Sequence, residues 1–164
     1  MSLGLESFPS PRAGEGRERG GVEQRAAIVA EARTWLGTKY HHRARVKGAG
    51  IDCGMLLIAV FSKVGLIEDF DPGYYPPDFN MHRSDEKYLG WLRAYAHEIP
   101  GPPLPGDLAL YKFGRCFAHG AIVVEWPTII HAYVKQGCVL ADAQRESALS
   151  DRPVVFFSIF GASL

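Results

Sequence analysis

Cys53 is the residue whose type and position best suit covalent chemistry. It follows Asp52, which can cap a helix whose body, residues 54–64, is apolar almost all round. The unpaired N–H groups and the positive end of the helix dipole favour the thiolate, which is the nucleophilic form of cysteine. Gly54 comes next and would let a substrate carbonyl approach the backbone N–H groups, as an oxyanion site requires. The alternative is that Cys53 is a small buried hydrophobe, the usual role of a free cysteine.

His119 and His131 are the candidate base and orienting group. They lie in AHGAIVV and TIIHAYV, two segments that alternate as neighbouring strands and are joined by a turn near residues 125–127. Antiparallel pairing centred on residue 125 would set the two histidines opposite each other on one sheet face, with Cβ atoms about 5 Å apart. If that face looks at the start of the Cys53 helix, nucleophile, base and orienting group form a chain. Taken singly, each histidine is better explained by a structural role, but together with Cys53 they favour catalysis.

A zinc site is the rival use of the same side chains. Its candidate ligands would be Cys53, His41, His42, His119 and His131. No pair among them has the short spacing of CxxC or HExxH, which disfavours this alternative. The sequence also has no glycine-rich phosphate loop and no G-x-S-x-G elbow, so nucleotide binding and serine hydrolase chemistry are excluded. We therefore expect no metal and no organic cofactor.

The composition is that of a single soluble domain without a strong charge. The chain has 164 residues, 47% of them hydrophobic, and its 18 Lys and Arg balance its 18 Asp and Glu. Such a chain has no overall field to attract nucleic acid or an anionic membrane. The apolar run 55–61 is too short to span a bilayer, and the chain does not open with the pattern of a secretory signal.

The cysteine count is odd, which excludes a complete disulfide framework and fits a reducing compartment. The other two cysteines, Cys116 and Cys138, are expected in a loop and in a short strand, where both would be structural.

The elements that must position these residues follow an α+β order. Residues 1–21 have almost nothing to bury and are expected to be disordered or loosely attached, which leaves residues 22–164 as one domain. Helical spacing predicts helices over 22–37, 52–65 and 84–99, with a loop rich in aromatics and proline over 66–83. Period-two alternation then predicts strands over 107–112, 118–126, 128–134, 137–142 and 153–160. Helices followed by a strand meander predict an antiparallel sheet packed on the helices.

A family resemblance rests on the segments that carry these residues. WLGTKYHHRARVKGAGIDCGMLL, followed by LPGDLALY, AHGAIVV and IIHAY, resembles the NlpC-type cell-wall cysteine peptidases, which have a papain-like fold. The resemblance covers about residues 24–134, and the YHH…VKG…DC spelling is most similar to the branch of tailed bacteriophages and prophages, whose members are tail-associated wall peptidases. The resemblance implies a hydrolase that cuts peptidoglycan peptides, commonly at a γ-D-glutamyl bond to a diamino acid.

The resemblance also implies roles for individual residues. Cys53 would be the nucleophile, His119 the general base and His131 the polar third member. Tyr40 matches the family tyrosine whose hydroxyl lies beside the nucleophile, and Asp52 matches the acid before it. These residues and Gly54 form the expected site.

Two departures from the family pattern concern substrate contacts. The common DCSG is here Asp52, Cys53, Gly54, Met55, and the HVGI-like segment is here HGAI from His119 onward. Neither change removes a proposed catalytic atom, but the first alters the oxyanion and substrate contacts. A non-catalytic tail or wall-binding module with the same fold therefore stays an alternative, as does a Cys-His amidase or acyltransferase acting on another amide bond.

Two further groups of side chains could contact a wall peptide. Aromatic side chains that could line a groove beside the nucleophile are Tyr74, Tyr75 and Phe79, although loop aromatics more often anchor on the core. Basic side chains that could attract its carboxylates are Arg43, Arg45 and Lys47, although such a cluster is more often a solvated loop. The expected partners are the peptidoglycan stem peptide and phage tail proteins, and the expected location is a virion tail, or the host cytoplasm before delivery to the wall.

Overall fold

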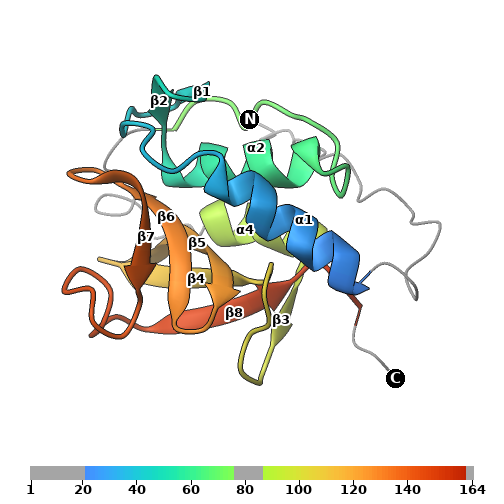
Figure 1. Ribbon diagram of the computed structural model, residues 1–164. Helices are drawn as coiled ribbons and strands as arrows, with labels where there is room; N and C mark the ends of the chain where they lie inside the picture. Colours follow the sequence, from blue (N-terminus) through green and yellow to red (C-terminus); the bar gives the residue numbers. More distant parts are fainter. Residues whose placement is uncertain (1–20, 76–86, 162–164) are drawn as a thin grey trace, which may run out of the picture.

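The fold is built on a six-stranded antiparallel sheet with helices on one side (Figure 1). The structure is a computed structural model that describes residues 21–75 and 87–161. The helices of these ranges are α1 (Gly21–Arg33), α2 (Cys53–Lys63) and α4 (Lys87–Tyr95). The strands are β1 (Arg45–Val46), β2 (Gly50–Ile51), β3 (His97–Ile99), β4 (Leu108–Phe113), β5 (Cys116–Glu125), β6 (Thr128–Tyr133), β7 (Gly137–Asp142) and β8 (Val154–Ser158). The large sheet has the order β3-β8-β4-β5-β6-β7, and β1 pairs with β2 separately.

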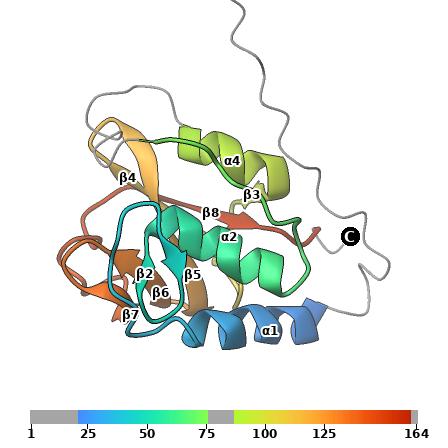
Figure 2. The ribbon, with the colours of Figure 1, turned by 90° about the horizontal axis from the view of Figure 1, so that it is seen from above.

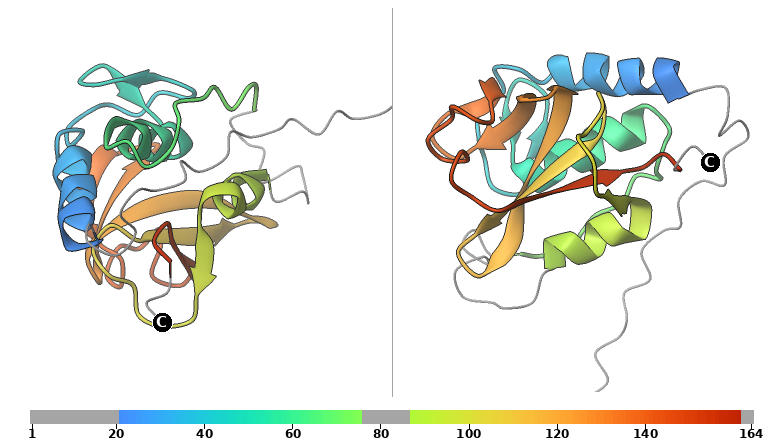
Figure 3. Two further views of the ribbon diagram at one scale, coloured as in Figure 1. Left: turned by 90° about the vertical axis from the view of Figure 1, so that its right-hand side faces the viewer. Right: turned by 90° about the horizontal axis from the view of Figure 1, so that it is seen from below.

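The α+β class predicted from the sequence is confirmed, because the helices pack on an antiparallel sheet. Seen from above, α2 lies between α1 and α4 (Figure 2). The sheet twists strongly, so that β6 and β7 lie toward α1 while β4 lies toward α4 (Figure 3). The five C-terminal strands agree with the alternating segments of the sequence to within a few residues.

α2 is the helix that begins at Cys53, and it forms for the reasons that the sequence indicates. The Asp52 side chain caps it by accepting a hydrogen bond from the Met55 amide at 2.8 Å. Residues 54–61 are all buried, which matches a helix that is apolar on every side. Gly65 follows the helix with φ of 77°, a conformation that glycine adopts without a steric penalty.

α1 ends where it meets the sheet. Ile28 and Ala32 are completely buried, and Gly37 leaves the following turn with φ of 87°. The Gly37 amide donates to the Cys138 carbonyl of β7 at 2.9 Å, and the Cys138 amide donates to the Thr38 carbonyl at 2.8 Å. These two bonds attach the segment that follows α1 to β7, an outer strand of the sheet.

Three expectations about local structure are wrong. The helix expected over 84–99 ends at Tyr95, and residues 97–99 form β3. This segment is a strand because its backbone hydrogen bonds with β8, which outweighs its helical pattern. Cys116 begins β5 instead of lying in a loop. The basic loop contains the short hairpin β1–β2, in which Gly48 turns the chain with φ of 80°.

Other expectations lie outside the described residues. These are the disorder or loose attachment of residues 1–20, the beginning of the helix expected from residue 84, and the contact of Phe79.

Two apolar cores flank the large sheet. The larger one joins the helices to even-numbered residues of the central strands, such as Leu110, Ile122 and Ile130. The smaller one uses odd-numbered residues, such as Tyr111 and Ile129, and is covered by Leu149 of the β7–β8 connection. Among the described helices, none has the length and apolar character to cross a membrane.

Candidate active site

A fork between β5 and β6 receives the start of α2. The pairing of the two strands ends at Ile122↔Ile130, beyond which β5 continues along β4 and β6 continues along β7. The Val123 carbonyl accepts from the Gly106 amide and the Val123 amide donates to the Asp107 carbonyl, just before β4. Because the backbone groups of successive residues in a strand point to alternate sides, the even-numbered residues of β5 turn their amides and carbonyls toward β6. The backbone groups of Ala118 and Gly120 therefore face the fork, beyond the part of β5 that pairs with β6.

Cys53 occupies this fork. Its Sγ lies 3.8 Å from the Ala118 carbonyl oxygen, and the Gly120 backbone amide hydrogen bonds to it. Cys53 thus contacts backbone groups of β5 that would pair with β6 if the two strands stayed together for longer.

A β-bulge shapes the same part of β5. Tyr111 pairs with His119 whereas Lys112 pairs with Phe117, so Ala118 is the extra residue. Bulges bend a strand and re-aim its side chains, and they occur often beside active sites. Here the bulge places the Ala118 carbonyl against the sulfur, immediately before the histidine expected to act as base.

His119 and His131 meet as the sequence predicts, although in a different register. Nε2 of His119 lies 2.8 Å from Nδ1 of His131, and the ring planes are 87° apart. The predicted direct opposition is wrong, because the register of Ile122↔Ile130, continued, sets His131 opposite Ala121. The histidines are diagonal neighbours that share a face, and their long side chains close the gap.

The thiol and the imidazole line one cleft of about 190 Å³. Cys53, Gly54, Asp52, Tyr40 and His119 all contribute to its wall, so every member of the expected site except the fully buried His131 borders it directly. Because His131 engages Nε2 of His119, Nδ1 is the nitrogen left for the thiol. Further lining residues that were not among the expected site residues are His42, Tyr75, Trp91, Phe113, Ala118, Ala132, Tyr133 and Val134.

Burial keeps both reacting groups neutral. The pKa of Cys53 is raised to about 12, first by burial and then by the Asp52 charge, while the amides of Gly120, Gly54 and Cys53 itself lower it. The pKa of His119 is held well below its usual value by burial, then by His131 and Arg152. The helix N–H groups do favour the thiolate, as the sequence predicts, but desolvation outweighs them.

His131 is also neutral in the folded chain. Burial lowers its pKa to about 4, against a smaller opposing effect of the Glu146 carboxylate. Its Nε2 is buried and has no hydrogen-bond partner among the described residues. A neutral His131 can accept from His119 through Nδ1, which selects the His119 tautomer whose Nδ1 is unprotonated.

Asp52 is occupied by structural hydrogen bonds. Besides capping α2, its buried carboxylate accepts from the Arg43 amide at 2.8 Å and from the Tyr75 hydroxyl at 2.5 Å. Nδ1 of His42 lies 3.7 Å from the Asp52 carboxylate, and Nε2 of the same ring lies within hydrogen-bond distance, 2.8 Å, of the Tyr75 carbonyl oxygen. Asp52 therefore joins the start of α2 to two loops that border the cleft.

Tyr40 stands beside the nucleophile. A bridge to Ile51 aligns its backbone with the segment that leads into α2. Its pKa is raised by burial and then by the negative charges that Cys53 and Asp52 carry when ionised, so its hydroxyl stays protonated.

Among the loop aromatics and basic side chains that could contact a substrate, only some border the cleft. Tyr75 is 6% exposed and lines the cleft, whereas Tyr74 is 70% exposed. The basic residues each have their own neighbours: Arg43 lies over the rings of Tyr74 and Tyr75, Arg45 pairs with Asp69, and Lys47 pairs with Glu31. None of the three basic side chains borders the cleft.

The described residues contain no group of three His, Cys, Asp or Glu side chains close enough to hold a metal ion. His41, one candidate ligand, instead turns Nδ1 toward the His42 carbonyl at 3.2 Å.

The sequence matches no protein-family model and no curated protein. Its fold is nevertheless similar to solved NlpC/p60 structures. The NlpC/p60 domain of the peptidoglycan hydrolase SagA aligns with a TM-score of 0.57 and 21% identity, over 80% of this chain and 96% of that one. NlpC1 from Trichomonas vaginalis aligns with a TM-score of 0.59 and 18% identity, over 84% of this chain and 44% of that one.

The peptidoglycan hydrolase RipB from Mycobacterium tuberculosis aligns with a TM-score of 0.58 and 15% identity, over 90% of this chain and 73% of that one. At these identities the likeness speaks for the fold alone. The chain has the papain-like fold of the NlpC/p60 domains, as its sequence predicts.

Proposed function

We propose that this protein is an NlpC-type cysteine peptidase that hydrolyses an amide bond in the peptides of bacterial peptidoglycan. The observation that carries the proposal is the His119–His131 contact of 2.8 Å at a cleft that Cys53 shares. The similarity of the fold to two peptidoglycan hydrolases supports the substrate class.

The proposed reaction begins from a neutral thiol and a neutral imidazole. Cys53 Sγ attacks the amide carbonyl while its proton passes to Nδ1 of His119, so the thiol is deprotonated during the attack and not before it. The backbone amides of Cys53 and Gly54 already point at the sulfur and would stabilise the developing oxyanion. His119 then protonates the leaving amine, which leaves an acyl-thioester on Cys53.

Deacylation uses the same groups. His119 removes a proton from a water molecule, the water oxygen attacks the thioester, and the thiol is regenerated as the carboxylic acid leaves. His131 touches no reacting atom in this scheme. It holds the His119 ring and stabilises its protonated form through the hydrogen bond at Nε2.

The finer assignments extend the proposal from the sequence resemblance. The bond cut would be a γ-D-glutamyl bond to a diamino acid, and the protein would act as a phage or prophage tail component, with tail proteins as partners. It would reside in the virion tail, or in the host cytoplasm before delivery to the wall. Mass spectrometry of purified tail particles tests this part, since the chain should copurify with them at a fixed ratio.

Digestion of purified muropeptides tests the activity. The wild type should release fragments whose masses identify one cleaved amide bond, and Cys53→Ala should release none. Fragments from both proteins would place catalysis elsewhere. If neither protein cleaves and both bind peptidoglycan, the chain is a binding module, and cleavage of a different amide by the wild type alone would make it another Cys-His amidase.

A further inference from the structure

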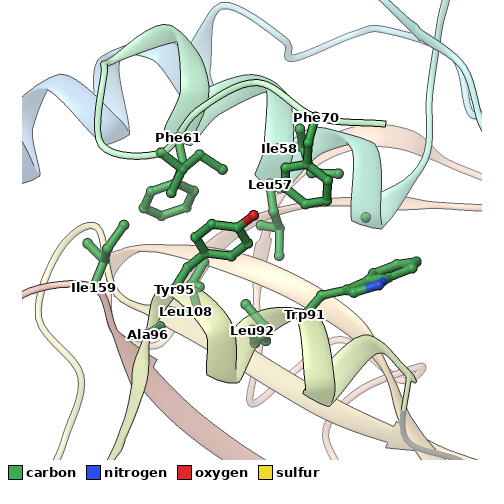
Figure 4. A pocket seen from close by; sticks show the side chains of 12 residues that line it. Leu57, Ile58, Phe61, Phe70, Trp91, Leu92, Tyr95, Ala96, Leu108 and Ile159 are labelled. Carbon is green, nitrogen blue, oxygen red and sulfur yellow. The ribbon is translucent and has the colours of Figure 1, made fainter. Parts of the chain in front are cut away.

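A second, apolar cavity adjoins the proposed catalytic cleft. It has a volume of about 50 Å³ and lies between α2 and α4. Figure 4 shows Leu57, Ile58 and Phe61 on the α2 side and Trp91, Leu92 and Tyr95 on the α4 side. We call it the α2–α4 cavity.

The α2–α4 cavity begins beside Cys53, the proposed nucleophile. Gly54 and Trp91 line both this cavity and the cleft that holds Cys53 and His119. Gly54 is the residue directly after Cys53, so a group attached to a carbonyl bonded to the sulfur would start beside the entrance. The two spaces are therefore neighbouring parts of one binding region.

The chemistry of the wall excludes a charged occupant. No charged side chain lines the α2–α4 cavity in the described part of the chain, and its α2 residues are at most 7% exposed. A carboxylate or ammonium group placed there would lose its hydration without a partner. The wall therefore suits a neutral aliphatic group.

One polar atom at the α2–α4 cavity could hydrogen bond with an occupant. The Tyr95 hydroxyl oxygen is buried and has no hydrogen-bond partner among the described residues, and Figure 4 shows it pointing across the cavity toward α2. Its pKa is raised by burial and then by Glu68, so it remains an O–H donor. An acceptor within the occupant would satisfy this donor.

The volume limits the size of the occupant. A single water needs roughly 10–15 Å³ on this measure, so about 50 Å³ takes a chain of about four non-hydrogen atoms. We propose that the α2–α4 cavity is an acyl-side subsite, which receives a short neutral aliphatic chain attached to the carbonyl that Cys53 attacks. This inference rests on the proposed function for the identity of the attacking group, but not for the binding of the chain. It departs from the finer assignment of a γ-D-glutamyl bond, because the wall does not fit the carboxylate of such a group. If the subsite is used, the amide that is cut has an uncharged acyl group.

Binding of neutral amides tests the subsite without any catalysis. In the full chain carrying Cys53→Ala, pentanamide should bind about tenfold more tightly than acetamide, since its longer tail leaves water. Titrations followed by methyl NMR should show the largest shifts at Leu57 and Ile58. Equal affinity for the two amides, or shifts confined to other methyl groups, would overturn the proposal.

Cavity-filling variants supply the control. Adding Leu57→Phe or Ala96→Leu, two positions on the wall, should abolish the preference for pentanamide. Leu140→Phe makes the same kind of change on β7, at a side chain that is 47% exposed and outside both spaces, and should leave it intact. Circular dichroism identifies a variant that fails to fold, in which case the other filling variant decides.

Tyr95→Phe removes the donor and keeps the ring. This variant should bind pentanamide at least as tightly as its parent, but 4-oxopentanamide several-fold less tightly, because the ketone oxygen loses its partner. Unchanged affinity for 4-oxopentanamide would overturn the part assigned to the hydroxyl.

Acylation by nitrophenyl esters separates a failure of the subsite from a failure of the proposed function. Sγ of Cys53 forms a bond to the ester carbonyl carbon, the carbon–oxygen bond breaks, p-nitrophenolate leaves, and the thiol proton goes to His119. The wild type should react faster with p-nitrophenyl pentanoate than with the acetate, and Leu57→Phe should lose that preference. A burst that needs Cys53 but ignores chain length contradicts the subsite, whereas an equal burst from Cys53→Ala contradicts the nucleophile while the amide titration still decides the subsite.

Discussion

At the scale of single residues, the decisive feature is that the proposed nucleophile and base are both neutral. A helix start usually favours a thiolate, but Cys53 is half-buried and lies near the Asp52 carboxylate, and desolvation together with this charge raises its pKa to about 12. His119, buried against His131, resists protonation as well. The site is therefore arranged for proton transfer during the attack, without a stored ion pair.

Alkylation rates test this electrostatic picture. Iodoacetamide should modify Cys53 slowly at pH 7, with a rate that still rises at pH 10, because the thiol pKa is about 12. Asp52→Asn keeps a capping side chain but removes the charge, so it should lower the thiol pKa and speed the reaction severalfold at pH 8. Peptide mapping identifies the labelled residue. A rate for Cys53 that levels off below pH 7 would mean that the thiolate is already formed.

Substitutions should grade the residues by role. Cys53→Ala, His119→Ala and their double variant should each lose nearly all turnover of a wall peptide, since members of one covalent mechanism do not contribute additively. His131→Asn or His131→Gln can still accept a hydrogen bond from His119 and should retain far more activity, with His131→Ala in between. Steady-state rates check the order. Independent, additive losses for Cys53 and His119 would show that they act in separate steps.

Burial of His131 predicts acid sensitivity of the fold. An unfolded histidine takes up its proton near pH 6.5, whereas His131 resists protonation until about pH 4. The unfolded state thus binds more protons in this window, so stability is full above pH 6.5 and falls as the pH decreases, by about 3 kcal/mol at pH 4 from this residue. Urea unfolding from pH 7 to pH 4.5 measures the slope. His131→Gln should have a shallower slope, and identical slopes would contradict the assignment.

At the scale of elements, two bulges explain what the sequence pattern could not predict. Period-two alternation located β5 and β6, and it placed both histidines in them. Near the turn, however, Glu125 pairs with Thr128, whereas Val123 pairs with Ile129, so Val124 is an extra residue. Without that bulge the turn register would put the histidines on opposite faces. Alternation carries no signal for an inserted residue, which is why the predicted pairing failed while the predicted contact is present.

A matched pair of glycines tests how closely the segment after α1 approaches β7. Gly137 and Gly65 both have φ of 77°, but a Cβ on Gly137 would lie 2.6 Å from the Thr38 carbonyl oxygen, whereas one on Gly65 would meet nothing within 4 Å. Gly65→Ala should cost about 1–2 kcal/mol for the left-handed backbone alone. Gly137→Ala should cost clearly more, because the two backbones must also separate. Denaturant unfolding compares them, and equal losses would argue against the close approach.

At the scale of the whole molecule, the sequence predicts the class and most of the core but not every element. The apolar helix follows from the uninterrupted apolar run Met55–Phe61, and the strands follow from the alternating segments that begin at residue 107. β3 was missed because His97–Ile99 continues a helical stretch and becomes a strand only by pairing with β8. The fork and the α2–α4 cavity depend on where separate elements stop pairing and packing, which local patterns do not encode.

The covalent intermediate is the most direct test of the central claim, that Cys53 cuts a wall peptide with His119 as its base. Wild-type protein would be mixed with a purified muropeptide, quenched in acid within milliseconds to seconds, and its mass measured before and after proteolytic mapping. The account predicts a transient mass increase equal to the acyl part of the cut peptide, located on the peptide that contains Cys53 and lost on further incubation. The same mixture with Cys53→Ala should show neither adduct nor products. Product formation with an adduct on another residue, or undiminished product formation by Cys53→Ala, would contradict the account.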